Sequence, residues 1–224
     1  EYREDWTYEG TSLGSFGVGS KITTFLSHWL TVATVRGGMS ETIKFTEGVF
    51  EDRKVEKSGY PTGTKVVWKP SEEFFTNTTV EVAKVKDLFR TITCLCQGLT
   101  IELDDNGKKT TYYSERGLMD LADDFVKDTE VIDKRFVMNY VDGKNKLDLI
   151  LTYTSNYSLT MIPYVNTGLT EKGPHIAQIK TIITREFNKF FREKKWLKEK
   201  DKNLTGDDIQ EGMYIVFNLT ASGV

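Results

Sequence analysis

The sequence predicts an α+β fold in two blocks, because segments of helical and of alternating apolar spacing follow one another along the 224 residues. Apolar residues make up 38% of the chain, which is enough for a packed core and argues against disorder. A charged stretch near Asp128–Asp133 separates the blocks. We therefore expect one domain over residues 1–129 and another over residues 130–224.

The first block begins with an irregular, Gly-rich segment that leads into a helix. From residue 20 onward, apolar residues recur at the spacing of one helix face: Ile22, Phe25, Leu26, Trp29 and Leu30. We expect the next elements to be strands over 31–36 and 41–47 around Gly37-Gly38, a charged loop over 51–61, a strand over 64–69, a helix over 80–97 ended by Gly98, a hairpin of strands over 99–103 and 110–113, and a helix over 114–127 capped by Ser114.

In the second block, the sequence pattern predicts three strands, a long helix and a final strand. The strands cover 136–140, 147–154 and 158–165, with a turn at Asp142-Gly143. An amphipathic helix covers 176–191, and the charged run over 192–202 extends it. The last strand covers 214–219.

Charge and cysteine content exclude several classes of protein. The formal net charge of -3 excludes a nucleic-acid binder that is basic over its whole surface, although one basic face remains possible. The two cysteines, Cys94 and Cys96, have no metal-ligating neighbours, and we interpret them as small apolar residues of a buried helix. So few cysteines indicate a reducing compartment, and no apolar run reaches the roughly 20 residues of a membrane helix.

The sharpest chemical signal is the segment Gly14-Ser15-Phe16-Gly17-Val18-Gly19, which runs into the first helix. Its glycines allow a tight backbone whose N–H groups, together with those of the helix start, favour a di- or triphosphate. Three alternatives remain open: a P-loop, whose lysine would fall one residue late at Lys21, a dinucleotide fingerprint, which lacks its strand and glycine order, and a hinge without ligand.

Four strings resemble the GHKL ATPases and, among them, the B subunits of type IIA DNA topoisomerases such as gyrase. The first is LGSFGVGSKITTFLS over residues 13–27, which is similar to the glycine box of the ATP lid. The second is TGTKVVWKP over residues 62–70. The third runs from Tyr164 to His175, with Lys172 and Pro174 departing from the family pattern, and the most specific is LKEKD followed by LTGDDIQEG over residues 197–212.

The resemblance implies a fold and a set of nucleotide contacts. Residues 1–129 are similar to the later part of a GHKL sandwich, and residues 130–224 to a β-α-β transducer of ribosomal-protein-like fold. Thr64 would hold the adenine, and Tyr8 would contact the nucleotide. Backbone amides of Gly14, Ser15, Phe16, Gly17, Val18 and Gly19 would hold the phosphates, although Ser15 and Phe16 replace the family's Leu-His.

The same resemblance implies ATP and Mg²⁺ as cofactors and a clamp that closes on double-stranded DNA. Its partners would be a second copy and the topoisomerase A subunit, in the cytoplasm. The catalytic base is expected upstream of this chain and the coupling lysine beyond its last strand, so the fragment alone is expected to be inactive. Alternatives are a mismatch-repair or chaperone-type GHKL ATPase, or an ATP-binding interaction module without catalysis.

Several conspicuous residues have simpler interpretations. We expect His28 to pack on the first helix, His175 to stabilise a turn, and Asp207 and Asp208 to cap a helix. The basic run from Arg185 to Lys202 is either a solvated helix face or a DNA contact, because acidic residues interrupt it.

Overall fold

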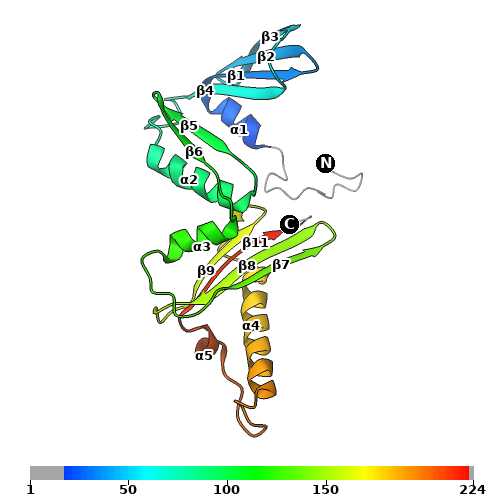
Figure 1. Ribbon diagram of the computed structural model, residues 1–224. Coiled ribbons are helices and arrows are strands. Elements are labelled where there is room, and N and C mark those ends of the chain that lie inside the picture. The colour runs from blue at the N-terminus through cyan, green and yellow to red at the C-terminus, as the bar shows by residue number, and fades with distance from the viewer. Residues whose placement is uncertain (1–17, 222–224) are drawn as a thin grey trace. The chain divides into compact units, whose positions relative to one another are not determined.

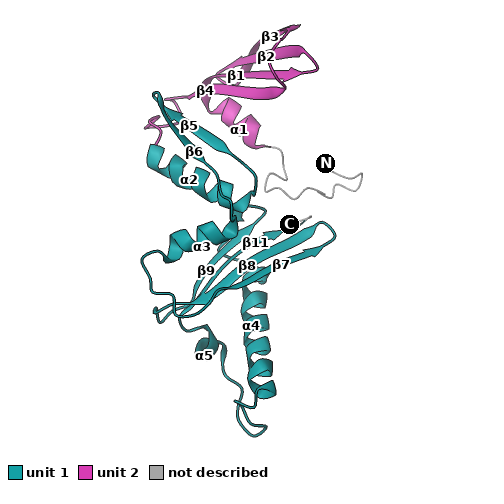
Figure 2. Ribbon diagram, in the orientation of Figure 1, with its two compact units in different colours: residues 1–13, 82–224 teal, residues 14–81 magenta. Residues whose placement is uncertain are grey.

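The computed structural model describes residues 18–221. Contacts divide the chain into two compact units, one of residues 14–81 and one whose described part begins at Val82 (Figure 2). Each unit combines helices with antiparallel strands, which confirms the predicted α+β class. No helix within the described range is both long and apolar enough to span a bilayer.

The first unit consists of a short helix and a four-stranded antiparallel sheet (Figure 1). Helix α1 (Gly19–Phe25) leads into a sheet of strand order β3-β2-β1-β4. The strands are β1 (Ser27–Arg36), β2 (Met39–Thr46), β3 (Val49–Lys57) and β4 (Gly63–Pro70).

Two predictions for this unit are wrong. Trp29 and Leu30 belong to β1 rather than to the helix, because β1 pairs with β2 on one side and β4 on the other. The predicted charged loop over 51–61 is mostly strand β3, an exposed sheet edge where both faces tolerate charge. A cross-strand ion pair of 2.6 Å between Arg53 Nε and Glu41 Oε1 accompanies this pairing.

The second unit opens with helix α2 (Val82–Leu95), the hairpin of β5 (Ile101–Asp105) and β6 (Lys108–Tyr112), and helix α3 (Leu118–Val126). Helix α2 ends at Leu95, two residues earlier than predicted, and Gly98 lies in the turn that follows, with a φ of +84°. Helix α3 begins later than predicted, because Gly117 has a φ of +58°. Ser114 is therefore not its N-cap; its hydroxyl donates to Asp120 Oδ2 over 2.7 Å.

A five-stranded sheet forms the rest of the second unit, in the order β10-β9-β11-β8-β7. Its strands are β7 (Phe136–Asp142), β8 (Asn145–Tyr153), β9 (Thr160–Val165), β10 (Gly168–Leu169) and β11 (Met213–Thr220). Helix α4 (Pro174–Glu193) and the short α5 (Gly206–Gln210) connect β10 to β11. The central β11 pairs in parallel with β9 and antiparallel with β8, as in a β-α-β crossover.

The two faces of this sheet carry separate cores. On one face Ile150 and Val216 pack with Cys94 and Leu121 of α2 and α3. On the other face Ile215 and its neighbours pack against the apolar side of α4. Alternation along β11 sends successive side chains to opposite faces, so a continuous apolar strand serves both cores. The division by contacts falls at Glu81, whereas the domain boundary near residue 129 stays a prediction.

Helix α4 ends at Glu193, so the prediction that the run 192–202 extends it is wrong. The backbone turns at Lys195, whose φ is +63°. The amides of Trp196 and Leu197 then both donate to the carbonyl of Phe191. This tight return brings the indole of Trp196 back onto the rings of the last helical turn, a contact that a continued helix would forbid.

Candidate nucleotide-binding and coupling site

The start of α1 is the described part of the predicted phosphate loop. Val18 precedes the helix, and its carbonyl accepts the first helical hydrogen bond, from Ile22 N over 2.9 Å. No side chain of residues 18–221 caps this end, and no acidic residue lies in the first turn. The first amides are thus open to an anion. Tyr8, Gly14, Ser15, Phe16 and Gly17 lie outside the described residues.

Gly19 is the phosphate-loop glycine whose surroundings the structure describes. A Cβ added there would meet no atom of the described chain within 4 Å. The fold itself therefore does not require glycine at this position. A ligand that approaches the backbone closely would require it.

Thr64, the predicted adenine contact, lies on the edge strand β4 with its side chain exposed. It pairs with Thr34 of β1, and the two Oγ1 atoms are 3.5 Å apart. Helix α1 joins the start of β1, whereas Thr34 lies near the end of the same strand. Among the described residues, the start of α1 and Thr64 are thus attached near opposite ends of one strand.

Sequence reasoning missed a polar row on the second sheet. Asn139 of β7, Asp148 of β8 and Asn218 of β11 are neighbours in register across three strands. Asn139 Nδ2 donates to Asp148 Oδ1, and Lys146 Nζ lies against Asp148 Oδ2, both at 2.6 Å. The available signal was an asparagine at position 218 inside an otherwise apolar strand; Asn218 is 6% exposed.

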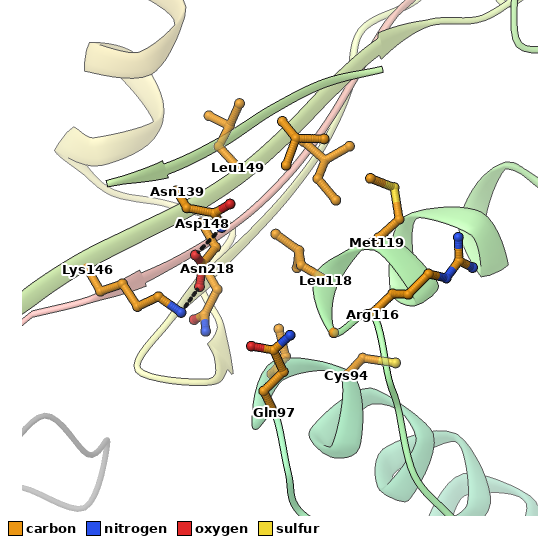
Figure 3. Close-up of a pocket in the computed structure, with 14 residues that line it drawn as sticks. Cys94, Gln97, Arg116, Leu118, Met119, Asn139, Lys146, Asp148, Leu149 and Asn218 are labelled. Atoms are coloured by element: carbon orange, nitrogen blue, oxygen red, sulfur yellow. Dashed lines mark hydrogen bonds and ion pairs between the residues drawn. The ribbon is translucent and has the colours of Figure 1, made fainter. Parts of the chain in front are cut away.

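This polar row lines a cavity of about 330 Å³ within the second unit (Figure 3). The sheet supplies its polar wall, and Leu118 and Met119 of α3 supply an apolar wall opposite. Gln97 closes the α2 end, and Arg116 stands beside α3. The cavity therefore lies between the α2–α3 pair and the strands that follow them in sequence, beside the core that they share.

An ion-pair network fixes α3 beside this cavity. The Arg116 guanidinium contacts Asp120 at 2.6 Å and Asp123 at 2.7 Å, and Arg135 also pairs with Asp123. Burial opposes ionisation of Asp120, but hydrogen bonds from Ser114 and Arg116 outweigh it and lower its pKa. The pKa of Asp123 is likewise lowered, because its contacts with Arg116 and Arg135 outweigh burial. Both carboxylates are therefore held ionised.

The remaining candidate residues, His28, His175 and Asp208, contact neighbouring groups of the fold. The prediction that His28 packs on a helix is wrong: it lies on β1, half exposed, with Nδ1 2.5 Å from Glu47 Oε1. His175 packs edge-on against Phe217, with ring centroids 6.1 Å apart. Asp208 forms a capping box with Thr205, which confirms a capping role.

The described cysteine and acidic side chains were also candidates for cysteine or metal chemistry, and their burial and arrangement argue against it. Cys94 is 2% exposed, as expected for an apolar helix residue, and burial raises the pKa of its thiol. Within residues 18–221, no group of three His, Cys, Asp or Glu side chains is placed to hold a metal ion.

Comparison with known proteins places this arrangement in a family. A family model described as DNA gyrase B matches residues 117–222. The B subunit of DNA topoisomerase 4 from Bacillus subtilis is 32% identical over 214 residues, which cover 93% of this chain and 33% of that relative. The chain belongs to the type IIA DNA topoisomerase B subunits. The B subunit of Thermus thermophilus DNA gyrase is 28% identical over 213 residues, covering 92% of this chain and 34% of that protein.

Solved structures of topoisomerase ATPase regions share the fold. The 43K ATPase domain of Thermus thermophilus gyrase B superposes with a TM-score of 0.75 at 26% identity, covering 93% of this chain and 59% of that one. The ATPase region of Saccharomyces cerevisiae topoisomerase II, at 17% identity and a TM-score of 0.73, shares the fold over 100% of this chain and 55% of its own. The expected fold of a GHKL ATPase domain is confirmed, whereas the transducer over residues 130–224 stays a prediction. The chain spans about one third of the length of the curated B subunits it matches.

Proposed function

We propose that this chain is the lid-and-coupling part of an ATP-operated DNA clamp in a type IIA topoisomerase. The supporting observation is that its likeness to solved B-subunit ATPase domains runs over 93% of the chain, across both units. The supercoiling or decatenating activity of the whole enzyme, its A-subunit partner, its dimerisation and a cytoplasmic location are part of this proposal.

The residues present fit ATP. Uncapped amides at the start of α1 suit a polyphosphate, and the backbone at Gly19 is open to close approach. The exposed hydroxyl of Thr64 can both donate to and accept from an adenine edge. Tyr8 and the amides of residues 14–17 would complete the grip. Mg²⁺ would be held by the phosphates and by residues outside 18–221.

In this proposal the chain's own residues bind, orient and relay, while the base that activates water comes from elsewhere in the subunit. Amides of residues 14–19 would hold the phosphates and exclude water as the lid closes. The α2–α3 pair shares a core with the five-stranded sheet. A displacement of these helices would therefore reach the sheet directly, and through it the DNA-cleaving part of the enzyme.

Double-stranded DNA is the proposed partner of the second unit. Lys180, Arg185 and Lys189 line an open groove along α4 whose lining includes no acidic residue. Further lysines follow in the loop after the helix. Cations that gather along one groove are typical of a phosphate-backbone contact, although Arg185 is also paired with Glu186.

The test is nucleotide-dependent dimerisation of the full-length protein, measured by light scattering with a non-hydrolysable ATP analogue. We expect Gly17→Ala to abolish dimerisation and Gly19→Ala to reduce it strongly, because a Cβ would force the backbone away from the phosphates. Gly19→Ala should not disturb the fold, since no atom of residues 18–221 lies within 4 Å of the added Cβ. Gly59→Ala, at an equally open position of the same unit, is the matched control.

Wild-type dimerisation by both phosphate-loop variants would contradict the proposed grip. The alternative, an interaction module without catalysis, predicts a different result. It requires that the full-length protein, supplied with its A-subunit partner and DNA, binds the analogue but does not turn over ATP.

A further inference from the structure

The loop that follows α4 is held in a defined conformation by one arginine. Arg192 Nη1 donates to the carbonyl of Lys198 over 2.8 Å, and Nη2 donates to the carbonyl of Asp201 over 2.9 Å. Its Nε and Nη2 also donate to Asn203 Oδ1, over 3.1 and 2.6 Å. A single guanidinium thus ties three points of the loop to the helix.

A second side chain on the same face of α4 secures the end of the loop. Asn188 lies one helical turn before Arg192 and is 6% exposed. Its Nδ2 donates to the carbonyl of Leu204 over 2.9 Å, and its Oδ1 accepts from the amide of Leu204 over 2.8 Å. The loop over residues 194–204, which we call the lysine loop, therefore runs back along the helix.

Aromatic packing fixes the start of the lysine loop. The indole of Trp196 lies 5.8 Å from the ring of Phe190 and 5.5 Å from that of Phe191, measured between centroids. Lys194 Nζ lies 5.6 Å from the centroid of Phe190. The loop is thus held at its start by rings, in its middle by Arg192 and at its end by Asn188.

The ordered loop presents cations to solvent. Lys194, Lys195, Lys198, Lys200 and Lys202 are all exposed, and none forms an ion pair with an acidic side chain in the part of the chain that is described. The nearby carboxylate of Asp201 accepts the backbone N–H of Lys198 over 2.7 Å and so helps to fold the loop. The ammonium groups remain available for an external anion.

We propose that Arg192 is a positioning residue for DNA binding: it holds the lysine loop so that Lys198, Lys200 and Lys202 meet the phosphate backbone, and it does not contact DNA itself. This differs from the sequence interpretation, in which Arg192 was one more cation of the basic run. The proposal rests on the proposed DNA clamp. An arginine already engaged with loop oxygens has few donors left, whereas an ordered loop loses less entropy on binding.

The first measurement needs no DNA. Trypsin cuts after lysine, and a folded loop resists it. In the 224-residue chain we expect Arg192→Gln to accelerate cleavage after Lys198, Lys200 and Lys202 by roughly tenfold. Arg185→Gln, on the same helix with its guanidinium paired to Glu186 rather than to the loop, should leave the cleavage rate unchanged.

The second measurement is a double-mutant cycle on binding to a fluorescein-labelled duplex DNA, followed by anisotropy. Arg192→Gln should weaken binding about fivefold, because the loop must then be ordered on binding. The triple variant Lys198→Gln, Lys200→Gln, Lys202→Gln should weaken binding further and flatten its salt dependence. Adding Arg192→Gln to the triple variant should cost nothing more.

Three results would overturn the inference. Unchanged cleavage of Arg192→Gln would show that the arginine does not order the loop. An equal loss of affinity with and without the lysines would show that Arg192 contacts DNA itself. Wild-type affinity of the triple variant would show that this loop does not contact DNA. The nucleotide-dependent dimerisation of the full-length protein is a separate test of the proposed function, and its outcome does not depend on this result.

Discussion

Tyr214 carries a buried hydroxyl that finds no hydrogen-bond partner within residues 18–221. Burial, followed by the neighbouring Tyr164, raises the pKa of this phenol far above its ordinary value. An unpaired buried hydroxyl costs free energy, so Tyr214→Phe should be neutral or raise the free energy of unfolding by about 1 kcal/mol in urea titration. A large destabilisation would show that this hydroxyl has a partner.

Tyr153 is the matched control for this residue-scale prediction. Its hydroxyl donates to the carbonyl of Ile209 over 2.8 Å and so ties α5 to β8. Tyr153→Phe should lower the free energy of unfolding by about 1 kcal/mol, because it leaves that carbonyl without its donor. The difference between the two identical substitutions isolates the effect of the hydrogen bond from the effect of losing an oxygen atom.

At the scale of elements, sequence patterns located most helices and strands. They failed where contacts with other parts of the chain determine whether a segment forms a helix, a strand or a loop. Apolar spacing alone could not separate α1 from β1, because Trp29 satisfies helical periodicity yet pairs with Thr46 of β2. Strand β3 was missed because an exposed edge strand carries charge on both faces and shows no alternation. The end of α4 was missed because hydrogen bonds from the Arg192 side chain to the carbonyls of Lys198 and Asp201 hold the chain in a loop there, which apolar spacing does not reveal.

The candidate site was predictable only in part. Glycine spacing marked the phosphate loop, of which the structure describes Val18 and Gly19, and the roles of the phosphate loop and of Thr64 stay predictions. The polar row under α2 and α3 left almost no sequence signal, because strand register alone brings Asn139 and Asn218 to either side of Asp148.

Helix α3 should lose stability in acid. Asp120 and Asp123 have folded-state pKa values below the ordinary 3.8, so they contribute stability above that value and lose it as the pH falls through their folded-state pKa. The free energy of unfolding should therefore decline as the pH is lowered below about 4. Arg135→Gln should flatten this decline, because it removes a partner of Asp123. Parallel pH profiles for the variant and the wild type would contradict the assignment.

At the scale of the whole molecule, the shared core predicts that α2, α3 and the five-stranded sheet unfold together. Leu121 is 2% exposed and packs in the cluster that contains Val216 of β11. Leu121→Ala should cost about 2–4 kcal/mol and should speed amide hydrogen exchange in β11 as well as in α3. Faster exchange confined to α3 would instead support independent domains divided near residue 129.

This cooperation gives the proposed clamp a physical route for coupling. Helices α2 and α3, which follow the unit of residues 14–81 in sequence, are built into the core of the sheet that carries α4 and the lysine loop. Nucleotide-driven displacement of α2 and α3 would shift packed side chains rather than slack linkers, and close-packed interiors transmit such strain.

In the proposed function, main-chain amides of residues 14–19 grip the phosphates of a bound nucleotide. Amide hydrogen exchange of the full-length protein, with and without a non-hydrolysable ATP analogue and Mg²⁺, tests it directly. We predict strong protection of residues 14–19 on binding, lost in Gly17→Ala. Protection elsewhere in the protein with unchanged exchange over residues 14–19 would contradict it.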